Sequence, residues 1–168
     1  VQTNGGSEHA AGVEGAIDRM AFEIGNSLRE KKTLVVWLFD VSPSLHVRRE
    51  KIADRVENIY NQLNKLNVGA DKALKTAVVT FGEKPMIVTK DPLDDTDEVI
   101  KTVRGIKSEE SGKENVFEAV ITATNKFKTY RTQQQRAMML VIVTDEAGSD
   151  IQNLEKAIVE TKRYGIKC

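Results

Sequence analysis

Apolar residues recur along the chain with two spacings that predict alternating helices and strands. An apolar residue at every third or fourth position is typical of a helix that buries one face. This spacing predicts an N-terminal amphipathic helix over residues 13–31, with Val13, Ile17, Met20, Ile24 and Leu28 on its buried face. The same spacing predicts further helices around residues 52–66, 94–106, 116–127 and 149–162.

Continuous apolar runs predict strands at residues 33–39, 74–81 and 137–144. A short strand, "MIVT", follows the turn "GEKP", and so short a connection makes it antiparallel to the strand before it. The final "YGIKC" begins one more strand. Strands that are apolar throughout, alternating with helices, are typical of an α/β protein with a doubly wound, mostly parallel sheet and helices on both faces.

Composition narrows the class of protein. The chain has 168 residues, the size of one domain, with 40% hydrophobic and 30% charged residues, and residues 1–12 are polar enough to predict a flexible tail. Its 25 basic and 25 acidic side chains give no net charge, which argues against nucleic acid as the main partner. No apolar run reaches about 18 residues, so we expect no membrane span in this chain.

The two ends of the sequence say little about the compartment. The single cysteine is the last residue, Cys168, which excludes an internal disulfide. The first residue is Val1, and no signal peptide follows it. We therefore expect a processed or cut chain, so any targeting segment would already have been removed.

Polar residues gather where the predicted strands end. The first strand runs into Asp40, Ser42 and Ser44, and the strand at 137–144 runs into Asp145, followed by Glu146. Glu114 and Asn115 precede the helix at 116–127. Ligands of open α/β sheets bind beyond the carboxyl ends of the strands, so we expect these side chains at one rim.

Carboxylates packed at one rim repel one another, and a bound cation offsets that repulsion. Carboxylate and hydroxyl oxygens suit Mg²⁺, Mn²⁺ or Ca²⁺ rather than zinc or copper. Side chains two apart in a bend can turn to one point, so Ser42 and Ser44 are predicted to bring hydroxyls to a metal that Asp40 holds through its second coordination shell.

The stretch "DVSPS" resembles the D-x-S-x-S motif of von Willebrand factor A domains of the bacterial type, the metal-ion-dependent adhesion site. The similarity extends in order and spacing over residues 32–168, through "AVVTFG", "SGKENVFEAV" and "VIVTDEAGSD". It implies a Rossmann-like fold and one divalent cation. Asp40, Ser42, Ser44 and Asp145 stand where the family has its site residues.

The resemblance also implies a function. Members usually serve as non-enzymatic recognition modules, so we expect a metal-dependent protein-binding module for adhesion or complex assembly. An acidic side chain of a protein partner would complete the metal coordination. The family resemblance further favours an extracytoplasmic or secreted location.

Two features depart from the family pattern. Glu114 stands where many members have a threonine, and it either ligates the metal directly or turns away to cap a backbone group. Cys168 falls inside a strand after which the family fold normally continues. We therefore expect the last strands to be missing, with the helix at 13–31 as a candidate cover for that surface.

Other interpretations of the same residues stay open. Asp40, Ser42 and Ser44 also suit a strand-end turn with a helix cap, and Asp145 suits a loop. Ser149 and Asp150 are predicted to be the cap and first turn of the next helix. The alternative functions are a structural subunit with a vestigial or purely structural metal site and, less favoured, a magnesium-dependent phosphatase using Asp40.

Overall fold

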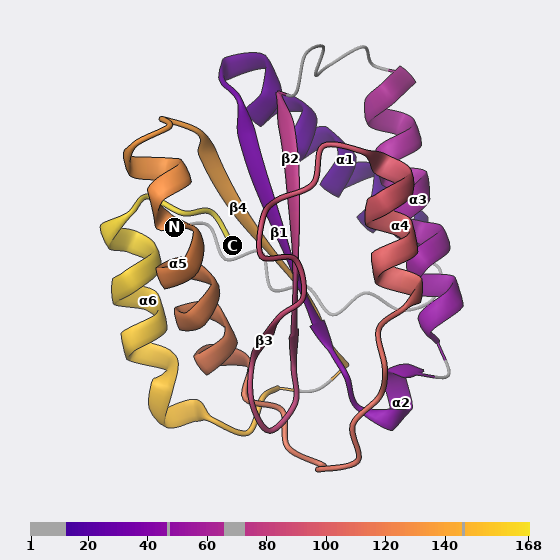
Figure 1. The fold of residues 1–168 in the computed structure, drawn as a ribbon, viewed down its shortest axis with the longest axis vertical. Coiled ribbons are helices and arrows are strands. Elements are labelled where there is room, and N and C mark those ends of the chain that lie inside the picture. The colour runs from indigo at the N-terminus through magenta and orange to yellow at the C-terminus, as the bar shows by residue number, and fades with distance from the viewer. Residues whose placement is uncertain (1–12, 47, 66–72, 146) are drawn as a thin grey trace.

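Helices and strands alternate along the chain as the apolar spacings predict (Figure 1). The computed structural model describes residues 13–46, 48–65, 73–145 and 147–168, so the predicted tail at 1–12 and Glu146 lie outside the described residues. The elements are α1 (Val13–Glu30), β1 (Thr33–Asp40), α2 (Pro43–His46), α3 (Arg49–Lys65), β2 (Leu74–Phe81), β3 (Met86–Ile87), α4 (Thr96–Arg104), α5 (Val116–Thr132), β4 (Ala137–Val143), the 3₁₀ turn η2 (Ile151–Asn153) and α6 (Leu154–Arg163).

The four strands form one sheet in the order β3-β2-β1-β4. The central strand β1 pairs in parallel with both β2 and β4, and β3 runs antiparallel to β2. The predicted mostly parallel sheet and the antiparallel short strand are therefore confirmed, although β3 is shorter than "MIVT". Because β1 lies inside the sheet, its last residue, Asp40, is flanked by the ends of two neighbouring strands.

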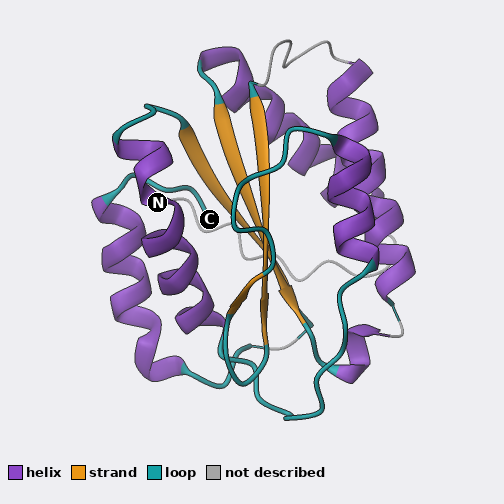
Figure 2. Cartoon of the chain, viewed as in Figure 1, coloured by secondary structure: helices purple, strands orange, loops and turns teal. Residues whose placement is uncertain are grey.

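Alternate side chains of β1 enter two separate cores, which is why its sequence is apolar throughout. Val35, Trp37 and Phe39 pack with α1, α3 and α4 on one face of the sheet. Leu34, Val36 and Leu38 pack with α5 and α6 on the other face. Helices therefore lie on both sides of the sheet (Figure 2). Each fully buried side chain of this size stabilises the fold by about 1.5–3 kcal/mol. The doubly wound architecture follows from these two cores.

The last part of the chain differs in detail from the prediction. The helix predicted at 149–162 begins only at Leu154, because the 3₁₀ turn η2 precedes it. The predicted strand after it appears as an isolated parallel bridge between Met139 and Lys167. Its two backbone hydrogen bonds are 2.7 Å and 3.1 Å long and place the final residues beside β4.

The N-terminal helix α1 belongs to the core on one face of the sheet. Ala21, Ile24 and Leu28 are buried in that core, which also contains Met139 and Val141 of the edge strand β4. Glu23 of α1 forms an ion pair with Lys167. The helix therefore covers part of one face of the sheet next to β4.

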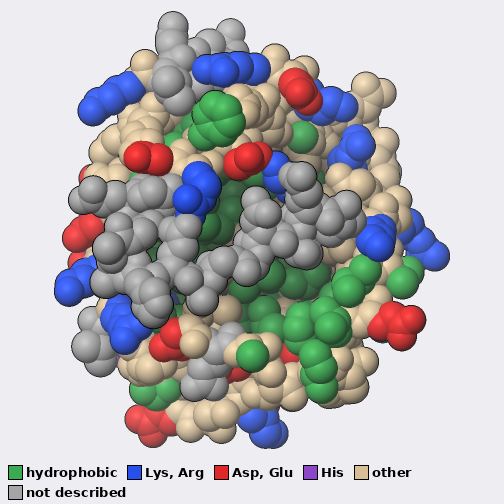
Figure 3. Space-filling view, turned by 180° about the vertical axis from the view of Figure 1, so that it is seen from behind, with side chains coloured by type: hydrophobic (Ala, Val, Ile, Leu, Met, Phe, Trp, Pro, Cys, Tyr) green, Lys and Arg blue, Asp and Glu red, His purple; other side chains and the backbone are tan. Residues whose placement is uncertain are grey.

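Apolar surface gathers on the face that is turned away in Figure 1, as Figure 3 shows. Among the described residues, Ile151, Ile158 and Val159 of η2 and α6 are large hydrophobic side chains that stay exposed. Each helix within the described ranges falls short of the length or apolarity that a bilayer crossing requires.

Candidate metal site at the carboxyl ends of the strands

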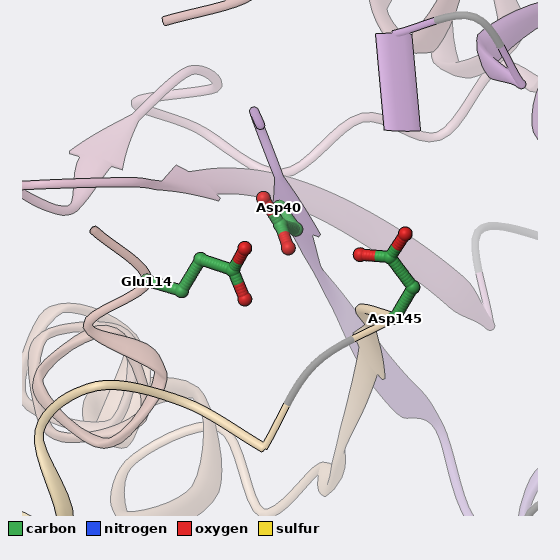
Figure 4. A group of neighbouring side chains, drawn as sticks. All are labelled: Asp40, Glu114 and Asp145. Atoms are coloured by element: carbon green, nitrogen blue, oxygen red, sulfur yellow. The ribbon is translucent and has the colours of Figure 1, made fainter. Parts of the chain in front are cut away.

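Three carboxylates, one at the end of β1 and two in loops, converge at the carboxyl ends of the parallel strands (Figure 4). Asp40 is the last residue of β1, Glu114 lies two residues before α5, and Asp145 lies two residues after β4. One carboxylate oxygen of each lies within 4.8 Å of the others. Asp40 and Glu114 are only 1% and 5% exposed, whereas Asp145 faces solvent. The cluster is therefore buried on one side and open on the other.

Asp40 is held in place by the two loops on either side of it. Its Oδ1 accepts a hydrogen bond from the backbone N–H of Ser42 (2.7 Å), and its Oδ2 accepts one from the Thr144 hydroxyl (3.1 Å). A buried carboxylate requires such donors, because burial without them strongly disfavours its charged form. The backbone beyond the strand stays tied to the sheet through Val41 N–H, which donates to the Phe81 carbonyl. These contacts fix the direction of the carboxylate.

The two serines of "DVSPS" turn their hydroxyls toward each other, as the spacing predicted. Ser42 Oγ and Ser44 Oγ are 3.0 Å apart. Ser44 Oγ also donates a long hydrogen bond of 3.5 Å to Asp145 Oδ1. The serine loop therefore reaches across to the loop that follows β4.

Glu114 is positioned through the backbone on both sides of its side chain. Its N–H donates to Ser149 Oγ (3.2 Å), and its carbonyl accepts from Ser149 N–H (2.7 Å). The next residue, Asn115, donates from its side chain to the Glu83 carbonyl and from its N–H to the Gly82 carbonyl. Glu114 thus points into the cluster from a segment that is hydrogen-bonded to the Gly82–Glu83 turn and to the loop containing Ser149.

The prediction for Ser149 and Asp150 was wrong. They do not cap the helix that follows them: α6 begins later, and Asp150 makes no side-chain cap bond to η2. Instead, the Asp150 carboxylate accepts from the N–H groups of Phe117 (3.1 Å) and Glu118 (2.7 Å) and so caps α5. Sequence reasoning missed this role because the partners are more than 30 residues apart.

Gly148 allows the loop after β4 to approach the start of α5 this closely. Its φ is +83°, a region that favours glycine. A Cβ at this position would lie 2.4 Å from Val116 Cγ1. The glycine, Ser149 and Asp150 together dock one rim loop on the segment that carries Glu114.

Sequence reasoning also missed Arg49, at the first residue of α3. The side chain is 4% exposed, and its three guanidinium nitrogens have no hydrogen-bond partner among the described residues. Burial lowers the pKa of Arg49, and the negative charge of Asp40 opposes that shift. In the sequence it stands within the charged run "RRE", which predicts an exposed helix start rather than a buried cation.

The donor set at this rim fits a hard divalent cation. All the side-chain donors named here are carboxylate or hydroxyl oxygens, which Mg²⁺, Mn²⁺ and Ca²⁺ prefer. A separate hollow of about 410 Å³ lies elsewhere, lined by residues such as Glu23, Arg131, Ala137 and Lys167. That hollow includes none of the five predicted site residues.

Comparison with known structures gives low sequence identity but the same fold. The VWA domain of SpRpn10 matches with a TM-score of 0.58 at 14% identity, over 80% of this chain and 71% of that chain. The conserved hypothetical protein BatB from Bacteroides thetaiotaomicron matches with a TM-score of 0.56 at 17% identity, over 80% and 63%. The vWF domain of the type V pili tip protein Mfa5 from Porphyromonas gingivalis matches with a TM-score of 0.53 at 16% identity, over 69% and 38%.

The chain spans less than two thirds of the Mfa5 and BatB structures, and these identities establish the fold alone. A comparison with curated proteins finds no significant match. A family model described as the von Willebrand factor type A domain matches residues 35–168, which is most of the chain. The chain therefore belongs to the von Willebrand factor type A domain family, as the "DVSPS" resemblance indicated.

Proposed function

We propose that this domain is a protein-binding module that depends on one divalent cation, Mg²⁺ or a similar ion. Domains of the family are generally non-enzymatic interaction or adhesion modules. The single observation that supports metal dependence is the convergence of three carboxylate oxygens within 4.8 Å at one rim. Asp40, Ser42, Ser44, Asp145 and Glu114 would hold the ion.

Each residue of the proposed site has a distinct role. Asp40 is committed to the Ser42 N–H and the Thr144 hydroxyl, so it orients the serine loop and acts from behind the ligands. The Ser42 and Ser44 hydroxyls, 3.0 Å apart, present neutral oxygens. Asp145 is exposed, so the side of the site next to it faces solvent and an incoming partner. When bound, the cation supplies a positive centre for an acidic group of that partner.

Glu114 bears on the kind of partner. If its carboxylate also ligates the ion, the negative charges of Asp40, Glu114 and Asp145 together face one dication, and an acidic partner group is disfavoured. The domain would then hold its ion for structure, as a subunit of a larger assembly, or bind a neutral or basic group. The burial of Glu114 supports this alternative, because a buried carboxylate requires nearby positive charge.

The proposal includes an extracytoplasmic or secreted location. The family resemblance favours it, and one structural relative is a pilus tip protein.

Isothermal titration calorimetry with MgCl₂ and MnCl₂ tests the proposed metal site. We expect one ion to bind per wild-type chain and Asp145→Asn to abolish or strongly weaken binding, because it removes one ligand charge at an exposed position. Asp91→Asn is the matched control, since Asp91 is also exposed and is not part of the cluster. Equal heats for the wild type and Asp145→Asn would reject the site.

A further inference from the structure

Arg49 is a buried cation whose hydrogen-bonding capacity is unused within the described part of the chain. It is 4% exposed, and Nε, Nη1 and Nη2 all lack a partner there. A guanidinium has five N–H donors, so burying it in this way is costly unless an opposite charge compensates. The neighbouring Arg48 is exposed, so the position at the start of this helix does not by itself bury an arginine.

The opposite charge comes from Asp40, one member of the carboxylate cluster. Arg49 lies close enough to Asp40 for that carboxylate to act on it electrostatically. Asp40 is itself 1% exposed, and its carboxylate accepts hydrogen bonds from the Ser42 N–H and the Thr144 hydroxyl. Arg49 therefore acts on the cluster through its charge in a desolvated setting, where Coulomb interactions are strong.

A charge count shows what this cation changes. Ionised Asp40, Glu114 and Asp145 contribute three negative charges, and Arg49 contributes one positive charge, which leaves two negative charges. One divalent cation brings that sum to zero. Without Arg49 the same sum would be three negative charges without the ion and one negative charge with it.

We propose that Arg49 is the internal counter-ion of the carboxylate cluster: it holds the three acids together in the ion-free protein and lowers their affinity for a divalent cation. This inference rests on the proposed metal site. It weakens ion binding, because the cation enters a cluster that is already partly neutralised. It also restores charge balance to a site that has Glu114 in place of a threonine.

The test compares Arg49→Met with the wild type, because methionine keeps an unbranched stem and removes the charge. In calorimetry with MnCl₂, we expect Arg49→Met to bind Mn²⁺ roughly tenfold more tightly, since the repulsion between two cations is gone. In EDTA, its melting temperature should fall below that of the wild type, and Mn²⁺ should raise it by more. Arg48→Met, the exposed neighbour, should change neither quantity, and Arg49→Lys should bind Mn²⁺ like the wild type.

If Arg49 has only a structural role, Arg49→Met should leave the affinity for Mn²⁺ unchanged or lower it. A folded Arg49→Met protein with unchanged or weaker Mn²⁺ binding would overturn the inference, and so would an Arg49→Lys protein that behaves like Arg49→Met. If Arg49→Met does not fold in EDTA, circular dichroism in saturating MnCl₂ should show the fold restored, and failure of this rescue rejects the inference. An absence of Mn²⁺ binding to the wild type would instead reject the metal site itself.

Discussion

Glu114 stands where the sequence resemblance places a threonine in many members of the family. Hydrogen bonds of Ser149 and Asn115 fix the backbone on both sides of Glu114. The segment that carries the Glu114 side chain is therefore held at the rim. Burial to 5% exposure makes this arrangement costly unless positive charge is nearby. The proposed cation is one source of that charge.

Replacement of Glu114 by threonine restores the commoner residue and tests whether the carboxylate ligates. We expect Glu114→Thr to weaken Mn²⁺ binding about tenfold, because one negative charge leaves a partly desolvated site. Calorimetry measures the affinity, and Glu110→Thr is the control, since Glu110 is exposed in the same loop and outside the cluster. Unchanged affinity would mean that the Glu114 side chain does not reach the ion.

The buried Tyr60 hydroxyl, which lies outside the site, should make the unfolding free energy depend on pH. Burial raises the pKa of its hydroxyl from 10.0 to about 12, while hydrogen bonds with Thr76 and Trp37 act in the opposite direction. The folded state therefore favours the protonated tyrosine, and its contribution is complete below about pH 10 and lost as the pH rises toward about 12. A shift of this size corresponds to roughly 2–3 kcal/mol.

Chemical denaturation across this alkaline window checks the sign. The unfolding free energy of the wild type should fall with pH more steeply than that of Tyr60→Phe, which lacks the ionisable hydroxyl. Parallel pH profiles would show that burial does not hold the proton on Tyr60.

At the scale of elements, the site depends on one helix cap supplied from a distant loop. Asp150 caps α5 through the N–H groups of Phe117 and Glu118, and Ser149 next to it holds Glu114. The cap of α4 is local by contrast, since Asp95 accepts from Asp97 and Glu98 within the same turn. Both caps are aspartate carboxylates that accept from backbone N–H groups. Only the Asp150 cap belongs to the loop that also holds Glu114.

This contrast gives a matched pair of variants. Asp150→Ala and Asp95→Ala should each lower the unfolding free energy by about 1–2 kcal/mol, because each removes a helix cap. Only Asp150→Ala should also weaken Mn²⁺ binding, since the loop that positions Glu114 loses its anchor. Urea denaturation and calorimetry measure the two effects, and equal Mn²⁺ affinity in both variants would separate the cap from the site.

The elements were predictable where the signal is local, and the contacts between loops were not. The run at 33–39 predicts a strand, because its residues are apolar on both faces, and "DVSPS" predicts converging hydroxyls, because its serines are two apart. The cap from Asp150 and the burial of Arg49 depend on tertiary packing, which overrides local preference for exposed polar residues. Sequence pattern alone cannot distinguish Arg49 from the exposed Arg48 beside it.

At the scale of the whole molecule, strand order determines where the chemistry is possible. With β1 between β2 and β4, the chain passes to α3 on one face and returns through α5 on the other. Loops from both sides of the sheet therefore meet beyond Asp40, as expected for open α/β sheets. The central claim is that this meeting point holds one divalent cation.

Anomalous scattering from a crystal grown with MnCl₂ tests that claim most directly. We predict one manganese peak per chain, within about 2.0–2.6 Å of the Ser42 and Ser44 hydroxyls and of a carboxylate oxygen of Asp145 or Glu114. Asp40 is expected behind these ligands, still bonded to the Ser42 N–H. A crystal that binds manganese only at other surface carboxylates, with the Asp40, Glu114 and Asp145 cluster free of anomalous density, would contradict the account.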